Sequence, residues 1–175
     1  WKLAYAVRSM VHTIVTVPDP ILREQSAPVE DPRVLEIQAL ITDLKESCIA
    51  AEGIGLAAPQ LRVAKRVVVI NHPQGKPYAL VNPEILWASS GTSALEEGCL
   101  SIPGVIVRVT RPKKVRVRAL DERGERWEMT ASDLLAKILQ HEVDHLNGVL
   151  ITDYAEGRPE HPETPQTSPG ALLKV

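Results

Sequence analysis

The stretch that decides the fold is ILQHEVDHLNG, residues 138–148. His141 and His145 are four residues apart, so on a helix they lie on one face about one turn from each other. Glu142 directly follows the first histidine. This HExxH pattern is typical of zinc hydrolases, in which two imidazoles bind the metal and the carboxylate acts on its water. A catalytic metal needs a third protein ligand, and the motif does not contain one.

The residues around this motif predict a buried helix. Leu134 and Ile138 precede the histidines at helical spacing and form one stripe with them. Thr130 and Asp133 resemble a capping box that opens the helix, and Gly148 closes it. Because apolar residues flank the histidines on both sides, we expect enclosed imidazoles. The alternative is an amphipathic helix whose histidines only hydrogen-bond in the core, since HExxH occurs by chance in roughly one such chain per hundred.

The rest of the chain predicts one more helix and several strands. Asp31-Pro32 predicts a helix start, and an apolar face then recurs as far as Cys48, with Gly53 as the stop. Cys48 is interpreted as a small core residue. Strands are expected at 66–70, 78–86 and 101–109, and a hairpin at 113–120 and 125–131. The fold class is therefore α+β, with antiparallel sheets packed around a central C-terminal helix that carries HExxH.

Composition and charge exclude several classes of protein. At 175 residues the chain fits one domain, and its net charge of −2 gives no electrostatic footprint for nucleic acid. The basic run at 111–118 is interpreted as the solvated face of a strand. No run reaches the ~18 apolar residues of a membrane span. Two cysteines do not suggest a disulfide framework, so we expect a soluble protein of a reducing compartment.

Three segments are expected along the chain. Residues 1–9 precede Met10 and are interpreted as an N-terminal extension, either a natural upstream segment or one that is not native. Residues 10–154 form the catalytic domain. Residues 155–175 are proline-rich, polar and without periodicity, and we expect a disordered tail there.

The best candidate for the third ligand lies upstream of the helix. Zincin peptidases take theirs downstream, but only about thirty residues follow His145, and Asp153 or Glu156 could serve only with an awkward return of the chain. Cys99, within EEGCLSIPG at 96–104, is flanked by turn residues from which a thiolate could point at a buried site. A Cys-His-His set leaves one position open for water. The alternative for Cys99 is a buried small apolar residue.

Three motifs together resemble those of the peptide deformylases. They are GIGLAAPQ at 53–60, EEGCLSIPG at 96–104 and QHEVDHLNG at 140–148, in that family's order and at its usual separations. The agreement spans about residues 10–154. The resemblance implies an α+β fold and an enzyme that removes the N-formyl group from the initiator methionine of newly made proteins, releasing formate.

The resemblance also implies a role for each matching residue. Cys99, His141 and His145 would be the metal ligands, and Glu142 the catalytic carboxylate. Gln60 and the backbone N–H of Leu100 would bind the oxyanion; a glutamine amide donates without ionising, as this role requires. The substrate-binding residues would be Ile54, Gly55, Gly98, Leu134 and Ile138. Lys137 falls near the pocket for the methionine side chain and can add its apolar stem to the wall.

Cofactor, partners and location follow from the same resemblance. We expect one divalent metal per chain, Fe²⁺ in the cell, with Zn²⁺, Ni²⁺ or Co²⁺ possible in a purified sample. The expected partners are formyl-methionyl nascent peptides and, transiently, the ribosome, with no nucleic acid and no membrane. The tail replaces a long C-terminal helix that many bacterial members have, which puts docking through such a helix in doubt. We expect a monomer in the bacterial cytoplasm, with an organelle as the alternative.

Two other functions fit parts of the pattern. A metallopeptidase of the HExxH type would use the same helix but needs a downstream ligand. A binding module with a structural metal site would need a fourth ligand, and no further Cys or His stands in a motif.

Overall fold

A computed structural model describes residues 10–155, so the predicted extension and nearly all of the predicted tail lie outside the described residues. The elements follow along the chain as η1 (Pro20–Arg23), α1 (Leu35–Ala50), β1 (Gly55–Ala57), η2 (Ala58–Leu61), β2 (Val67–Ile70), β3 (Tyr78–Ala88), β4 (Thr92–Cys99), β5 (Ile102–Pro112), β6 (Lys114–Leu120), β7 (Arg126–Ser132), α2 (Asp133–Leu146) and α3 (Ile151–Ala155). Within this part of the chain, no helix has both the length and the apolar character needed to cross a membrane.

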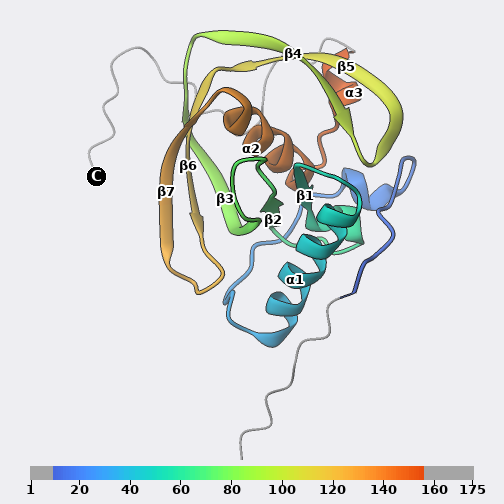
Figure 1. The fold of residues 1–175 in the computed structure, drawn as a ribbon, viewed down its shortest axis with the longest axis vertical. Helices are drawn as coiled ribbons and strands as arrows, with labels where there is room; N and C mark the ends of the chain where they lie inside the picture. The colour runs from blue at the N-terminus through green and yellow to red at the C-terminus, as the bar shows by residue number, and fades with distance from the viewer. Residues whose placement is uncertain (1–9, 156–175) are drawn as a thin grey trace, which may run out of the picture.

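Two antiparallel sheets surround α2. The larger sheet has the strand order β1-β2-β3-β6-β7, and β4 pairs with β5 in the smaller one. Figure 1 shows α2 in the middle of the molecule, with the larger sheet along one side and the β4–β5 pair crossing above it. The predicted α+β class, with antiparallel sheets around a central C-terminal helix, is confirmed.

The larger sheet is covered by a helix on each face. Val68 and Ile70 of β2 belong to the apolar cluster that contains Leu139 and Val143 of α2. The alternate residues Val67 and Val69 belong to the cluster built around α1. Successive side chains of a strand point to opposite faces, so β2 is apolar throughout because both of its faces are buried. This packing fixes α2 against the sheet.

The β4–β5 pair brings the EEGC segment to the other side of α2. Glu97 pairs with Val107 and Gly98 with Ile106, and the register then shifts so that Cys99 pairs with Ile102. Such an irregularity re-aims the side chains that follow it. Cys99 is the last residue of β4 and is 9% exposed. The segment predicted to be bounded by turns is therefore mostly a strand.

Both predicted helix starts are wrong, whereas the predicted end of α2 is confirmed. The first helix begins at Leu35, and the Asp31 carboxylate accepts a hydrogen bond from the N–H of Arg33 instead of capping the helix. Thr130 belongs to β7, because pairing with β6 continues as far as Ser132 and leaves no room for a capping box. Gly148 has φ +71 just beyond α2, where a Cβ would overlap the Arg23 carbonyl, so only glycine fits there.

Candidate metal centre

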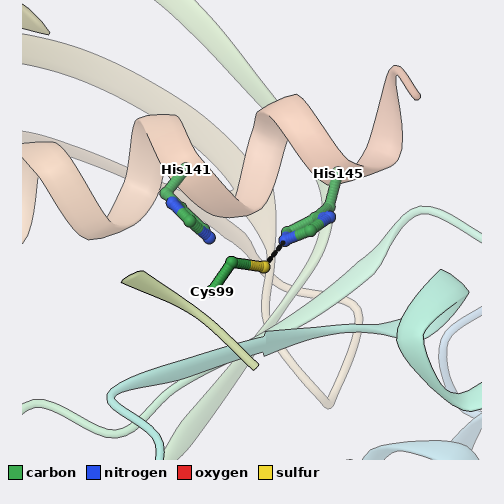
Figure 2. Close-up of side chains that lie close together, drawn as sticks. All are labelled: Cys99, His141 and His145. Atoms are coloured by element: carbon green, nitrogen blue, oxygen red, sulfur yellow. Dashed lines mark hydrogen bonds between the residues drawn. The ribbon is translucent and has the colours of Figure 1, made fainter. Parts of the chain in front are cut away.

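Three side chains from two elements converge on one point. His141 and His145 project from the same face of α2, and Cys99 reaches them from the end of β4 (Figure 2). The sulfur of Cys99 lies 3.2 Å from Nε2 of His145, and one possible ligand atom of each of the three residues lies within 4.8 Å of the others. The structure thus brings together the sequence-predicted Cys-His-His set.

The donor set fits a divalent metal. Bonds of about 2.3 Å to sulfur and 2.1 Å to nitrogen around a tetrahedral ion would separate the donor atoms by roughly 3.5 Å. The pair formed by Cys99 and His145 is at 3.2 Å, and all three donors lie within 4.8 Å of one another. One thiolate and two imidazoles suit borderline ions such as Fe²⁺, Co²⁺, Ni²⁺ and Zn²⁺. Oε2 of Glu142 is buried without a hydrogen-bond partner within residues 10–155, so the carboxylate beside the three donors is not fully satisfied by protein groups.

Glu142 lies beside the three ligands and is 4% exposed. Burial is the main reason that the pKa of its carboxyl is raised to about 7 in the metal-free protein. A carboxyl group with a pKa near neutrality can both accept and deliver a proton at physiological pH. The backbone of Gly55 runs directly against this side chain, and a Cβ at that position would overlap the Glu142 carboxylate.

The two histidines have opposite charge preferences in the metal-free protein. Burial lowers the pKa of both imidazoles. For His141 the sulfur of Cys99 and the carboxylate of Glu97 outweigh burial and hold the pKa above its usual value. For His145 the neighbouring charge of His141 adds to burial and keeps the pKa low. In the metal-free protein His145 is therefore neutral, whereas a metal that binds to His141 has to displace a proton from its imidazole.

A buried ion-pair network stands behind His141. Glu97 accepts a hydrogen bond from Nδ1 of His141 at 3.0 Å and binds Arg111 through both carboxylate oxygens, at 2.6 and 2.9 Å. Arg111 also donates to Asp144 at 2.8 Å and to the hydroxyl of Tyr154 at 3.1 Å. Burial opposes the charge of Arg111, but these partners keep its pKa above the ordinary value.

This network corrects two interpretations of the sequence. Arg111, the first residue of the basic run at 111–118, is 1% exposed and does not belong to a solvated face. Asp144 lies inside the HExxH motif, where the sequence leaves two roles open, the orientation of a ligand histidine and exposure to solvent. Its side chain is buried and paired with Arg111. The sequence did contain a signal: Arg111 is in phase with Val107 and Val109, the inward positions of an alternating strand. Neither Glu97 nor Arg111 was assigned a role.

A cavity of about 560 Å³ opens in front of the centre. It is lined by nearly all of the residues that the sequence singled out, namely Ile54, Gly55, Gln60, Gly98, Cys99, Leu100, Leu134, Ile138, His141 and Glu142. His145 is not in its wall and lies behind the others. Gln60 is 2% exposed; its Oε1 accepts the N–H of Ala57 at 2.8 Å and its amide nitrogen donates to Ser101 at 3.1 Å. Its amide is thus held at the wall of the cavity.

An α+β domain with Cys-His-His donors and a buried carboxylate at a cavity wall has the construction of a metal-dependent hydrolase. Comparison with known proteins identifies the family of hydrolases to which the chain belongs. The sequence model of the family described as polypeptide deformylase matches residues 11–160. The chain belongs to this family.

Individual relatives agree. The peptide deformylase of Bartonella tribocorum is 47% identical over 150 residues, which is 82% of this chain and 84% of the relative. A peptide deformylase crystal structure from Legionella pneumophila superposes with a TM-score of 0.78 at 42% identity, covering 82% of this chain and 85% of that one. The Acinetobacter baumannii enzyme, solved with Met-Ala-Ser bound, gives 0.79 at 34% identity, covering 83% and 99%.

Family membership establishes the reaction class. The chain is a metal-dependent hydrolase that removes the N-formyl group from the initiator methionine of newly synthesised proteins. The deformylase function that the three motifs implied is thereby confirmed.

Proposed function

We propose that Cys99, His141 and His145 hold one divalent ion, Fe²⁺ in the cell, and that formyl-methionyl peptides are hydrolysed in the cavity in front of it. The observation that carries this assignment is the convergence of the three donors beside Glu142 at one cavity wall. Zn²⁺, Ni²⁺ or Co²⁺ can take the place of iron, because a mixed sulfur and nitrogen set accepts several borderline ions.

Glu142 moves the proton. When bound, a divalent ion supplies Lewis-acid chemistry that lowers the pKa of a water molecule from about 15.7 toward 7. Glu142 takes the proton from the attacking water as the new C–O bond forms at the formyl carbon. It then delivers that proton to the amine nitrogen as the C–N bond breaks, so the products are formate and a peptide with a free amino terminus. A carboxyl pKa near 7 suits both halves of this transfer.

Gln60 and Leu100 stabilise the developing negative charge. The amide of Gln60 is held against Ser101, and Leu100 directly follows the ligand Cys99, so both groups line the cavity next to the metal ligands. Fixed donors of this kind contribute because they need no reorganisation during the reaction; losing one typically costs about 3 kcal/mol in the transition state. Neither donor can ionise near neutral pH.

The peptide lies between two backbone segments. Ile54 and Gly55 form one wall of the cavity and Gly98 the other, and the small residues let a substrate strand approach closely. Leu134 and Ile138 of α2 supply apolar surface for the methionine side chain. The relative whose crystal structure has Met-Ala-Ser bound supports a tripeptide-sized site.

The cellular setting is part of the same proposal. We take residues 10–154 as the catalytic unit, with residues 1–9 and 155–175 outside it. The enzyme acts as a monomer in the bacterial cytoplasm, on formylated nascent chains and in transient contact with the ribosome. Bacterial relatives support this setting.

Formate release from formyl-Met-Ala-Ser tests the proposal. Protein prepared without oxygen and containing about one metal ion per chain should release one formate per peptide. An internal peptide bond, offered in an acetylated peptide of the same length, should stay intact. Cleavage of the internal bond without formate release would instead identify an HExxH peptidase.

A further inference from the structure

Lys137 is a buried lysine in the wall of the cavity. It lies on α2, is only 8% exposed, and lines the cavity together with Leu134 and Ile138. Lysine is almost never this buried unless its ammonium group is paired. No hydrogen bond or ion pair of its Nζ is formed within the part of the chain that the structure describes. The ammonium nitrogen itself is not among the buried atoms that lack a partner, so its donors face the solvent that fills the cavity and can be offered to a ligand.

The acidic groups of the cavity do not provide a partner for this lysine. The Glu97 carboxylate is already paired with Arg111 and His141. Glu142 stands beside the metal ligands, and no ion pair of its carboxylate with Lys137 is formed in the described structure. Among the described residues that line the cavity, Lys137 is the only lysine or arginine.

Its place on the helix separates it from the reacting atoms. Lys137 precedes His141 by one turn, which is about 6 Å along the helix axis. Long side chains on a helix lean toward its N-terminus, so this one leans away from the histidines and toward Leu134. Leu134 and Ile138 form the apolar surface assigned above to the first side chain of the substrate. The ammonium group therefore belongs to the part of the cavity that receives this side chain.

We propose that Lys137 is a specificity-determining residue that donates a hydrogen bond to the first side chain of the substrate. The class of substrate it favours is a formyl peptide whose first side chain has the length of methionine and carries a strong acceptor, with methionine sulfoxide as the natural example. A thioether is only a weak acceptor, whereas oxidation of methionine adds a polar oxygen to the same chain. This inference rests on the proposed function and extends it to substrates with an oxidised first residue.

A comparison of substrates with different first side chains tests the proposal. The substrates are formyl-X-Ala-Ser peptides in which X is methionine sulfoxide or norleucine, which has no acceptor. We expect Lys137→Met to lower the ratio of kcat/KM for sulfoxide over norleucine by roughly ten- to hundredfold, the range for a hydrogen bond to a charged group. Lys137→Arg, which keeps a cationic donor, should retain most of the ratio. Lys76→Met removes an exposed lysine that is not among the lining residues of the cavity and should leave the ratio unchanged.

Equilibrium binding gives a second readout without turnover. Calorimetry on the product tripeptides compares the affinities for Met(sulfoxide)-Ala-Ser and norleucine-Ala-Ser. Lys137→Met should lower the ratio of these two affinities by the same factor. An equal ratio in the parent and Lys137→Met would overturn the proposal. The proposal would also be overturned if Lys137→Met changed the ratio of kcat/KM for formyl-Met-Asp-Ser over formyl-Met-Ala-Ser instead, because the ammonium group would then recognise the second residue of the substrate. Formate release by the parent from formyl-Met-Ala-Ser tests the deformylase function separately from either result.

Discussion

Glu97 accepts a hydrogen bond from Nδ1 of His141 at 3.0 Å, and this bond fixes how the imidazole faces the metal centre. An ionised carboxylate can only accept, so the imidazole keeps its proton on Nδ1 when a metal displaces the proton on Nε2. Arg111 in turn clamps both oxygens of Glu97. The orientation of a ligand on α2 is thus set by an arginine on β5.

Loss of Arg111 should therefore weaken metal binding without removing a ligand. We expect Arg111→Met to bind Co²⁺ roughly 10- to 100-fold more weakly, the usual effect of losing the partner of a ligand histidine. Glu97→Gln should weaken binding in the same way while it keeps the shape of the side chain. Competition with a chelator of known affinity measures both.

The matched control for Arg111 is Arg118. It is exposed on β6, where it pairs with Glu84 at 2.6 Å, and an exposed pair contributes little. Arg118→Met should bind Co²⁺ like the parent. Parent-like affinity in folded Glu97→Gln would show that His141 is oriented by the helix alone.

The same carboxylate predicts an acid-dependent stability of the metal-free protein. Burial raises the pKa of Glu97, but the bonds from His141 and Arg111 outweigh it and bring the pKa below the ordinary 4.5. Below pH 4.5 the unfolded chain therefore binds more protons than the folded one, so the stabilisation is complete above 4.5 and is lost as the pH falls through the folded pKa. Thermal unfolding should show a constant Tm difference between the parent and Glu97→Gln from about pH 5 to 6, below the titration of His141, and this difference should shrink toward pH 3. A difference independent of pH would contradict this assignment.

Local sequence patterns predicted the centre of this fold better than its edges. The spacing of Ile138, His141 and His145 predicts one enclosed helix face, because a helix brings such residues together without help from the rest of the chain. Leu134, at the start of the same predicted stripe, is instead 39% exposed at the cavity. The position of Arg111 depends on the β4–β5 register and on packing against α2 and α3, and neither is a local property. For the same reason the capping box failed, since the pairing of Ser132 with Lys114 decides where α2 begins.

Replacement of Glu142 separates the proton transfer from metal binding. We expect Glu142→Gln to keep about one metal ion per chain and to lose at least a hundredfold in kcat, because it removes the group that carries the proton but no ligand. Metal analysis and formate release on one preparation measure both. Glu46→Gln, an exposed position on α1, is the control for the loss of one negative charge and should retain full activity. Full activity of Glu142→Gln would remove Glu142 from the mechanism.

Replacement of Cys99 and replacement of Cys48 should have different effects on metal binding and activity. Cys99→Ala removes a ligand atom, so we expect very weak metal binding and essentially no formate release. Cys48 is fully buried in the α1 cluster, and burial raises the pKa of its thiol to about 12, so it stays protonated and unreactive. Cys48→Ala should lose only some stability and bind metal like the parent. Air should inactivate the iron form faster than the nickel or zinc form, because iron bound to a thiolate promotes oxidation of the sulfur. Parent-like metal affinity in Cys99→Ala would place the third ligand elsewhere.

A side chain at Gly55 should impair catalysis, although the backbone angles at this position do not require glycine. The Cβ of an alanine there would overlap the carboxylate of Glu142, a buried group that cannot move away without leaving its place beside the ligands. We expect Gly55→Ala to stay folded, since β1 is a short strand at the edge of the larger sheet, and to bind metal while kcat falls at least tenfold. Gly91→Ala is the matched control, because nothing lies within 4 Å of a Cβ at that glycine, and it should behave like the parent. The measurements are formate release, metal content and Tm of the parent, Gly55→Ala and Gly91→Ala. Unchanged kcat in Gly55→Ala would mean that Glu142 can act from a second position, and the close contact between these two residues would then have no part in the reaction.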